Sequence, residues 1–240
     1  MEQIVKVFEI LLKEYGPQGW WPLVSLHGKG GGNPTKTGAV EGYHPGDYSF
    51  PHDERERFEI CCGAILTQNT GWVSVEKALL NLKKIDALSV KGILGVDEEL
   101  LRQAIKPAGY FNQKAKKLKI FAEFFGKLDG RVPSREELLD IWGVGPETAD
   151  SILLYGFGVP VFVIDAYTKR IFSRLGVCKA DVNYEELQEM FVETLGGFTE
   201  KNLEKFNEYH ALIVEHAKRY CRTKPECEGC VLKKNCAHTL

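Results

Sequence analysis

The chain has 240 residues, of which 44% are hydrophobic and 27% charged, a composition typical of a folded protein and unlike that of a disordered one. Its 31 Lys and Arg residues nearly balance 33 Asp and Glu residues, which gives a net charge of −2. This balance excludes a uniformly basic protein, so any nucleic acid would have to bind a local basic face. The sequence has no apolar run of eighteen residues, and five of its first fifteen residues are charged. We therefore expect a soluble, intracellular protein without a membrane span or a signal peptide.

Helical periodicity extends over most of the chain. A first helix is predicted from about Ile4 to Tyr15, where Gly16–Pro17 ends it. Residues 16–52 hold nine glycines and five prolines and are expected to form a long loop. From Asp53 onward the apolar spacing predicts helices over 54–68, 72–84, 97–105, 111–125, 134–142, 147–156, 163–175, 183–195 and 200–219. Since no segment alternates convincingly as a strand does, the predicted fold class is all-α.

Four of the seven cysteines lie within the last twenty residues, in the pattern Cys221-x5-Cys227-x2-Cys230-x5-Cys236. Disulfides are uncommon inside cells, so a cluster this tight indicates a metal centre. A zinc ribbon usually has two Cys-x-x-Cys pairs separated by a longer spacer, and only Cys227 and Cys230 form such a pair. The spacing therefore favours a cubane iron–sulfur cluster, with a zinc site or a chance grouping as the alternatives.

Positive charge gathers around these cysteines. Six basic residues oppose two acidic ones, which gives a local charge of 6 − 2 = +4. The basic residues are Lys218, Arg219, Arg222, Lys224, Lys233 and Lys234, and the acidic ones are Glu226 and Glu228. Such a run is either a solvated face or a contact for phosphates, and its place beside a metal-braced loop makes it a candidate DNA contact.

A second signal lies in residues 138–150, Leu-Leu-Asp-Ile-Trp-Gly-Val-Gly-Pro-Glu-Thr-Ala-Asp. An apolar helix runs into Gly143-Val144-Gly145, and a new helix begins at once. The glycines allow a tight turn, and the second helix presents unpaired N–H groups and the positive end of its dipole to an anion. This pattern predicts a helix–hairpin–helix that grips a DNA phosphate without reading sequence. The alternative is an ordinary helical corner with glycines at a C-cap.

An acidic residue, Asp165, follows the hairpin in Val161-Phe-Val-Ile-Asp-Ala-Tyr-Thr-Lys-Arg170. Its place before a helix would also suit a simple N-cap. Together, the hairpin, this acid and the four cysteines resemble the helix–hairpin–helix superfamily of DNA glycosylases, in its endonuclease III branch with a C-terminal iron–sulfur loop. The resemblance extends from about Glu54 to Cys236. It implies two helical domains with a DNA-binding cleft between them, a catalytic Asp165, and a [4Fe–4S] cluster held by Cys221, Cys227, Cys230 and Cys236.

The resemblance also implies a mechanism. Such enzymes swing the target nucleotide out of double-stranded DNA into a pocket and break the bond between base and deoxyribose through an oxocarbenium-like state. Asp165 would stabilise the positive charge and orient the attacking water. Endonuclease III itself has a lysine right after the hairpin that forms a Schiff base and cuts the strand. This chain has Glu147 there, and because a carboxylate cannot form an imine, we expect a monofunctional glycosylase without strong AP lyase activity.

The same resemblance assigns residues to DNA. Gln68, in Gly63-Ala-Ile-Leu-Thr-Gln-Asn-Thr70, resembles the glutamine that fills the gap left by the flipped base, and Asn69 stands beside it. A polar helix end is the alternative reading of this segment. The hairpin residues expected to contact DNA are Gly143, Val144, Gly145 and Thr148.

Three segments resemble the 3-methyladenine DNA glycosylase III subgroup: Gly19-Trp-Trp-Pro22, Leu66-Thr-Gln-Asn-Thr-Gly-Trp72 and residues 106–117. There, paired aromatic side chains sandwich the methylated base, so Trp21 and Trp72 are expected as the two walls of a base pocket, with Trp20 nearby. An alkylated purine is electron-poor and cationic, and it stacks favourably on indole faces. The alternative is that these tryptophans belong to the core. This chain departs from the subgroup in carrying the four-cysteine loop and the glycine-rich loop.

We predict a central helical domain over 54–160 and a second domain formed by 1–53 and 161–240, which includes the cysteine loop 221–236. The predicted function is excision of an alkylated purine such as 3-methyladenine by a monomer that acts on double-stranded DNA of the cytoplasmic nucleoid. One alternative is a bifunctional or mismatch-type endonuclease III-like glycosylase/AP lyase. The other is a non-catalytic iron–sulfur DNA-binding module, against which the intact Asp165 argues.

Overall fold

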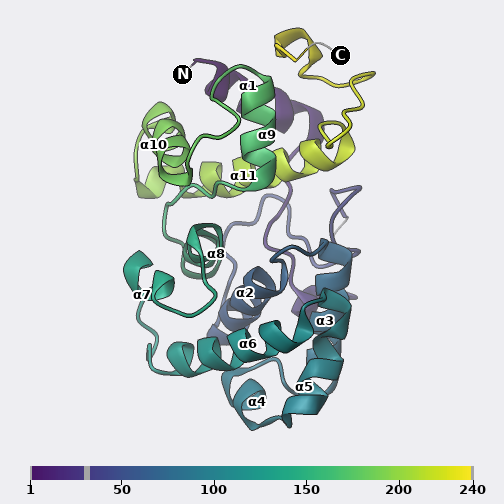
Figure 1. Cartoon of the computed structure of the whole chain (residues 1–240), viewed down its shortest axis with the longest axis vertical. Helices are drawn as coiled ribbons and strands as arrows, with labels where there is room; N and C mark the ends of the chain where they lie inside the picture. Colours follow the sequence, from purple (N-terminus) through teal and green to yellow (C-terminus); the bar gives the residue numbers. More distant parts are fainter. Residues whose placement is uncertain (1, 30–32, 239–240) are drawn as a thin grey trace.

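The computed structural model describes residues 2–29 and 33–238. These residues form helices joined by loops and contain no strand, so the predicted all-α fold class is confirmed. The helices form two groups (Figure 1). The first consists of α2 (Glu54–Leu66), α3 (Trp72–Lys84), α4 (Val90–Gly95), α5 (Glu98–Ile105), α6 (Phe111–Gly126), α7 (Arg135–Leu139) and α8 (Pro146–Ser151). The second consists of α1 (Glu2–Tyr15), α9 (Ala166–Arg174), α10 (Tyr184–Leu195) and α11 (Leu203–Arg219). None of the described helices is long and apolar enough to cross a membrane.

Helix α4 has no counterpart among the predicted elements. Its six residues include Gly92 and Gly95, and because glycine has low helix propensity, the local sequence gives little helical signal. Ser89 caps the helix by accepting a hydrogen bond from Gly92 N, and packing on α6 buries Ile93 fully. A Cβ at position 92 would lie 2.4 Å from the Asp86 carbonyl oxygen, so this packing requires glycine.

Near the candidate site, one predicted helix boundary is wrong and one predicted helix changes type along its length. The helix predicted over 163–175 begins only at Ala166, because Asp165 is its N-cap and therefore has an extended backbone. The helix predicted over 147–156 is α-helical through Ser151 and continues as a π-helix over Ile152–Gly156. Segments of π-helix are frequent at functional sites, and this one carries Tyr155, which the candidate site contains.

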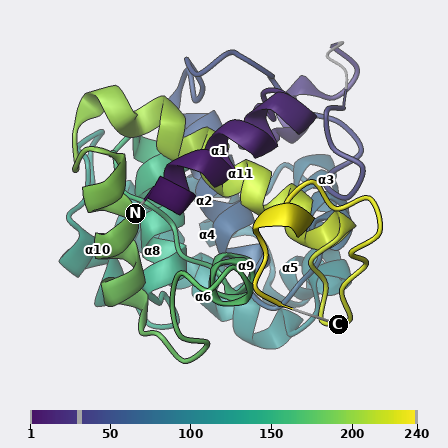
Figure 2. The same ribbon diagram turned by 90° about the horizontal axis from the view of Figure 1, so that it is seen from above.

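Helix α1 packs against α10 and α11 although almost the whole chain separates them (Figures 1 and 2). Ile4, Val7 and Leu11 lie buried along one face of α1 at helical spacing. The Tyr209 hydroxyl on α11 donates a hydrogen bond to the Ile4 carbonyl oxygen at 2.6 Å. On these contacts we propose that the two ends of the chain share one domain, as the division into 54–160 and 1–53 with 161–240 predicts.

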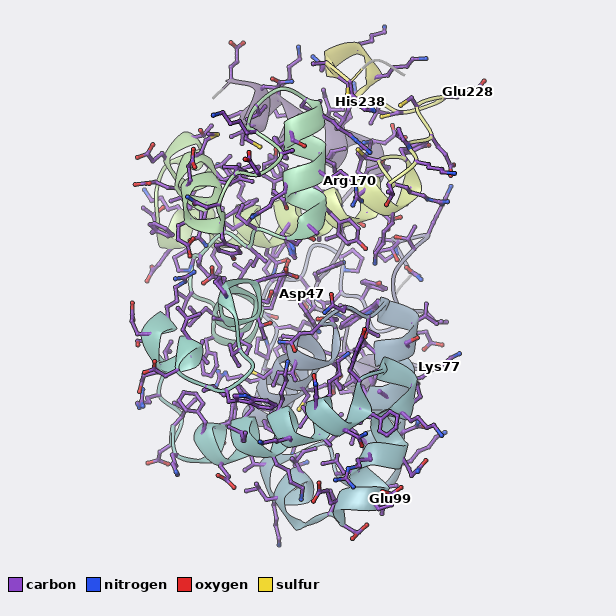
Figure 3. All side chains as sticks on the ribbon, viewed as in Figure 1. Asp47, Lys77, Glu99, Arg170, Glu228 and His238 are labelled. Carbon is purple, nitrogen blue, oxygen red and sulfur yellow. The ribbon has the colours of Figure 1, made fainter. Side chains whose placement is uncertain are left out.

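The long loop 16–52 contacts both groups of helices, although the predicted division places it with the second group. A short 3-10 helix in this loop, η1 (Val24–Leu26), packs on α3. By contrast, Gln18 binds Glu208 on α11 through its backbone N–H. Asp47 lies at the level where the two groups meet (Figure 3). The loop therefore links the two groups.

A buried polar network anchors the second helix of the hairpin. Asp150, fully buried on α8, accepts hydrogen bonds of 2.7 Å from Arg135 Nε, the Tyr184 hydroxyl and Gln188 Nε2. Arg135 begins α7, whereas Tyr184 and Gln188 belong to α10. Because a buried carboxylate depends on all its partners, this network fixes the hairpin relative to the second group of helices.

Candidate active site

Asp165 lies where the chain passes from the first group of helices to the second. Its Oδ1 accepts hydrogen bonds from Thr168 N at 2.7 Å and from the Thr168 hydroxyl at 2.8 Å, so the alternative prediction of an N-cap is confirmed. The residue is only 7% exposed. In the part of the chain that the structure describes, no hydrogen bond reaches the other oxygen, Oδ2. The cap thus orients the carboxylate and leaves one oxygen available for chemistry.

His210 on α11 faces this second oxygen. Its Nε2 lies 3.6 Å from Asp165 Oδ2, and its Nδ1 lies 2.7 Å from the Tyr155 hydroxyl. When Tyr155 donates to Nδ1, the neutral ring carries its proton on Nε2, toward the carboxylate. Burial raises the pKa of Asp165, but the His210 ring and the bonds from Thr168 outweigh it, so the pKa lies below its ordinary value. Asp165 is therefore ionised at neutral pH.

Sequence reasoning missed His210 and Tyr155 because both occupy buried positions in apolar helical patterns. His210 continues the stripe that holds Phe206 and Ile213. A lone histidine on such a stripe is more often part of the core than of a site, and only its position opposite Asp165 distinguishes it. The one signal in the sequence is that His210 is an ionisable residue in a stripe of otherwise apolar residues.

The three tryptophans predicted for the base pocket come together beside His210. Trp20 and Trp72 are nearly parallel, with ring centroids 6.5 Å apart and an interplanar angle of 15°. Trp21 stands edge-on to Trp72, with the centroids 5.0 Å apart. The His210 ring is 5.6 Å from that of Trp20 and nearly perpendicular to it. Since His210 also faces Asp165, the aromatic cluster and the carboxylate form one site.

The structure orients the predicted walls differently from one another: the parallel partner of Trp72 is Trp20, whereas Trp21 is perpendicular to Trp72. Trp21 is 5% exposed and packs on α2, where a Cβ at Gly63 would lie 2.8 Å from its Nε1. Trp21 thus belongs to the core, whereas Trp20 and Trp72 are partly exposed. Within the described chain, the buried indole N–H groups of all three find no acceptor.

Glu147, the residue at the position of the lyase lysine, belongs to the same site. It is the second residue of α8 and is accessible to solvent. Even so, the surrounding protein desolvates its carboxyl group and raises the pKa of Glu147 to about 7; Asp165 raises the pKa as well, while His210 and Lys169 oppose the shift. Neighbouring carboxylates disfavour joint ionisation, so Glu147 binds a proton near neutral pH while Asp165 stays charged.

The predicted hairpin forms between α7 and α8. Gly143 has φ = +86°, which favours glycine. Gly145 is the N-cap of α8, and Pro146 occupies the first helical position, where its missing N–H costs nothing. Val144 and Thr148 are buried. The hairpin can therefore offer an anion its backbone, but these two side chains point into the protein rather than toward DNA.

Gln68 lies against the hairpin, and its amide is fully engaged there. Its Nε2 donates to the Gly143 carbonyl oxygen at 2.9 Å and to the Thr148 hydroxyl at 3.0 Å. Its Oε1 accepts a hydrogen bond from Lys117 Nζ at 2.5 Å. Gln68 thus braces the hairpin in this structure. Its role in the gap left by a flipped base stays a prediction, since the amide would first have to leave these three bonds.

Two exposed residues beside Gln68 extend the candidate DNA face. Asn69 is exposed with φ = +52°, and Tyr110 is 69% exposed with φ = +45°. A hydrogen bond from the Thr70 hydroxyl to the Ala108 carbonyl oxygen, 2.5 Å long, joins the two segments. Sequence reasoning missed Tyr110, because an apolar pattern does not show which aromatic side chains the fold leaves in solvent.

The four cysteines of residues 221–236 line a single cavity of about 390 Å³ beside α9. Two arginines of α9 bind this loop: Arg170 Nε donates to the Cys221 carbonyl oxygen at 2.7 Å, and Arg174 Nη1 donates to Cys221 Sγ at 3.2 Å. Figure 3 shows Arg170 on α9, below the loop that carries Glu228 and His238. Since Asp165 caps the same helix, α9 connects the cysteine loop with the candidate active site.

A family profile described as "HhH-GPD superfamily base excision DNA repair protein" matches residues 62–196. The chain belongs to this superfamily. The matched range contains the Gln68 segment, the hairpin, Glu147 and Asp165. This HhH-GPD protein is thus a base excision repair DNA glycosylase of the endonuclease III-like kind.

Its relatives agree with this assignment. The chain is 43% identical to "Putative DNA repair glycosylase MJ1434" of Methanocaldococcus jannaschii over 98% of its own length and 96% of that protein's. It is 32% identical to endonuclease III of Thermotoga maritima over 78% of this chain and 86% of the relative.

Two solved structures share the fold. The 3-methyladenine DNA glycosylase (MagIII) of H. pylori, bound to 1,N6-ethenoadenine, superimposes with a TM-score of 0.64 and 27% identity over 90% of this chain and 96% of that one. An endonuclease III in a non-covalent DNA complex superimposes with a TM-score of 0.72 and 22% identity over 98% and 94% of the two chains.

Proposed function

We propose that this HhH-GPD glycosylase is monofunctional: it hydrolyses the N-glycosidic bond of a damaged nucleotide in double-stranded DNA and leaves the strand intact. One observation carries the proposal, namely that an ionised Asp165, whose Oδ2 accepts no hydrogen bond among the described residues and faces His210 at 3.6 Å, lies near Glu147, where a lyase has its amine. Hydrolysis needs the carboxylate, whereas strand cleavage through a Schiff base needs the amine.

Asp165 acts on the sugar. As the bond to the base breaks, positive charge develops on the deoxyribose ring, and the fixed negative charge of Asp165 stabilises it. Thr168 holds Oδ1, so Oδ2 is the oxygen that faces the sugar or orients the incoming water. His210 Nε2 lies 3.6 Å from the same Oδ2 and helps to hold it in place. The electron pair of the broken bond leaves with the base, so a cationic base departs neutral, and water adds its hydroxyl to the sugar carbon and releases its proton to solvent.

The flipped base enters the slot between Trp20 and Trp72. Their rings are nearly parallel, and the centroid separation of 6.5 Å is close to twice the ~3.4 Å rise between stacked bases, which supports a planar ring bound between them. Indole faces favour a cationic, electron-poor ring, which supports an alkylated purine such as 3-methyladenine as the substrate. The 27% identical MagIII, whose structure contains 1,N6-ethenoadenine, supports the same choice.

One feature of the pocket favours a second substrate class. The buried indole N–H groups of Trp20 and Trp72 find no acceptor in the described chain, and an unpartnered buried donor is costly. Each N–H points outward in the plane of its own indole ring, so a base stacked between the two faces cannot accept it, whereas the carbonyl oxygens of a uracil or thymine bound at the ring edges could. A pyrimidine mispaired with guanine is therefore the second candidate.

Base release from a panel of duplexes separates these possibilities. The panel contains 3-methyladenine, 1,N6-ethenoadenine, uracil opposite guanine and thymine opposite guanine, each assayed in single turnover. We expect the alkylated purines to be released fastest, and Trp72→Ala to slow their release at least about tenfold through the loss of stacking, worth about 1–3 kcal/mol per base. Preferential release of uracil or thymine would make the second candidate the substrate class. Release unaffected by Trp72→Ala would remove the slot from recognition.

We further propose that the loop 221–236 holds a [4Fe–4S] cluster. All four cysteine side chains line one cavity, which apolar residues such as Ile171 and Leu175 complete. Around a zinc ion, with sulfur at about 2.3 Å, the thiolates would converge on one point. The proposal rests on the spacing of the four cysteines in the sequence and on the cavity that they share; a cubane would bind each cysteine through a separate iron. When bound, the cluster braces the loop and its basic residues.

The purified protein should therefore be brown, with about four iron atoms per chain. Replacing Cys227 by alanine should disorder the basic loop and weaken binding of duplex DNA. Because the loop contributes phosphate contacts, the fall of log K with log salt should become less steep. Iron analysis and binding titrations at several salt concentrations measure both effects. A colourless protein with about one zinc per chain would contradict the assignment.

A further inference from the structure

Four buried glutamates hold the loop 16–52. The loop has little regular secondary structure, so its buried N–H groups need acceptors from elsewhere. Glu59 on α2 and Glu76 on α3 bind it from the first group of helices, and Glu208 and Glu215 on α11 bind it from the second. None of the four is more than 4% exposed. A buried carboxylate that accepts backbone N–H groups makes a strong, charge-assisted attachment.

Two of these glutamates, Glu208 and Glu59, bind the backbone on either side of the Trp20–Trp21 pair. Glu208 accepts hydrogen bonds from Gln18 N, at 2.9 and 3.0 Å to its two oxygens, two residues before Trp20. Glu59 accepts a hydrogen bond from Val24 N, three residues after Trp21. The other two attach the loop farther away: Glu76 binds Val40 N and Glu41 N, and Glu215 binds Lys36 N and the Thr37 hydroxyl.

The backbone between the segments that Glu208 and Glu59 bind is also fixed, by polar contacts to the carbonyl oxygens of Trp20 and Trp21. Asn207 Nδ2 donates to the Trp20 carbonyl oxygen at 3.3 Å, and His44 Nε2 lies 3.1 Å from that of Trp21. Gly19 has φ = +65°, and a Cβ there would lie 2.3 Å from Pro45 N. The tryptophan pair therefore sits on a fixed stretch of backbone.

A negative charge on Glu59 or Glu208 costs free energy, because both carboxyl groups are buried. Burial raises the pKa of Glu59 and of Glu208 to about 7, against the opposing effect of the backbone hydrogen bonds. A glutamine would avoid that cost, but it would present one oxygen where Glu208 presents both of its oxygens to Gln18 N. This difference favours a carboxylate at position 208.

We propose that Glu59 and Glu208 are positioning residues for base recognition, which clamp the Trp20–Trp21 segment from the two groups of helices and so set the slot between Trp20 and Trp72. This inference rests on the proposed function of that slot. Glu208 ties Trp20 to α11, whereas Trp72 begins α3, so the separation of the two rings depends on the clamp rather than on either helix alone. A shift of the Trp20 ring relative to the Trp72 ring would change the stacking energy of a flipped base. Because that energy depends on the size and charge of the base, the shift would also change which base is preferred.

Isosteric substitutions test the clamp against matched controls. Glu59→Gln is compared with Glu76→Gln, and Glu208→Gln with Glu215→Gln, so that each pair shares the burial and the group of helices; the two control glutamates differ in also facing His27 and Arg219, respectively. All four variants remove one acceptor from the same loop, and all four should lower the midpoint of thermal unfolding. Only Glu59→Gln and Glu208→Gln should lower single-turnover release of the preferred base, by about tenfold or more, and change the ratio of its rate to that of the next base in the panel.

A second measurement needs no substrate. In a Trp142→Phe background, which removes the exposed tryptophan, the remaining emission comes from Trp20, Trp21 and Trp72. Acrylamide should quench this emission more strongly in Glu59→Gln and Glu208→Gln than in their controls, because a released segment admits the quencher. Quenching can be compared for any variant whose circular dichroism shows that it keeps its helices. If Glu208→Gln does not fold, the comparison of Glu59→Gln with Glu76→Gln tests the proposal by itself.

The outcomes separate the clamp from the proposed pocket. If Trp72→Ala impairs release and the clamp variants behave as their controls do in both assays, the clamp is wrong and the pocket stands. If Trp72→Ala has no effect on any base in the panel, the pocket is wrong, and quenching alone decides whether Glu59 and Glu208 hold the tryptophans. Equal quenching in all four variants would overturn the proposal.

Discussion

Replacing Asp165 by asparagine should slow base release by about 10³-fold or more, since a fixed charge aimed at the transition state is among the largest contributions to catalysis. The fold should survive, because asparagine caps helices as well as aspartate does and its Oδ1 can still accept both bonds from Thr168. Affinity for lesion duplex should change little, since the substitution removes a negative charge and no phosphate contact. Single-turnover excision and a binding titration measure the two effects separately.

Thr168→Val is the matched control. It removes the hydroxyl bond to Asp165 Oδ1 but keeps the backbone N–H bond and the charge of the carboxylate. One hydrogen bond of about 1 kcal/mol should cost about tenfold or less in rate. Release by Asp165→Asn within tenfold of the unmodified enzyme would remove the carboxylate from the mechanism, whatever the control shows.

Lesion DNA treated with the enzyme should stay unbroken until alkali or heat cleaves the abasic site, and borohydride should trap little covalent enzyme–DNA adduct. The reason is the carboxyl group of Glu147 at the start of α8, where a lyase needs an amine. Gel electrophoresis of treated duplex, with and without alkali, measures strand cleavage, and denaturing electrophoresis after borohydride treatment measures the adduct.

Glu147→Lys should introduce weak lyase activity, visible as borohydride trapping that the unmodified enzyme lacks. An attacking amine must lose its proton, and desolvation of the site, which raises the pKa of the present carboxyl group, would lower the pKa of an amine there. The nearby Asp165 acts in the opposite direction by favouring the charged amine, so the gain should be modest. Glu147→Gln, which is isosteric but has no nucleophile of this kind, should show none.

Native lysines are the competing explanation for any residual cleavage. The lysines of α6 are occupied: Lys114 Nζ binds the Leu66 and Ala108 carbonyl oxygens, and Lys117 Nζ binds Gln68. Desolvation raises the pKa of Glu147 and lowers the pKa of Lys218; the charge of Lys169 opposes the first shift and the charge of Asp165 opposes the second, so both lysines lie near the candidate site. Efficient trapping by the unmodified enzyme, abolished by Lys169→Ala or Lys218→Ala, would overturn the monofunctional assignment.

Local sequence determined the features that depend on neighbouring residues: the positions of helices, the hairpin turn and the cap of α9. Helix positions follow apolar spacing, and α3 begins and ends at the predicted residues, Trp72 and Lys84. The glycines of the hairpin and the acid before α9 adopt the predicted turn and cap, because a tight turn needs glycine and a helix start needs an acceptor. Local sequence was misleading where tertiary packing overrode propensity, as in the glycine-containing α4.

Tertiary structure alone decided how the candidate site is assembled. His210 reaches Asp165 from 45 residues along the chain, and Glu208 reaches Gln18 from 190 residues away. Which tryptophans stack was likewise beyond the sequence, because Trp20 and Trp21 are neighbours, and the packing of Trp21 on Gly63 decided which one faces Trp72. A sequence pattern specifies which residue types are present and how each helix presents them. The meeting of side chains from distant segments depends on the free energy of packing the whole chain, which no local window contains.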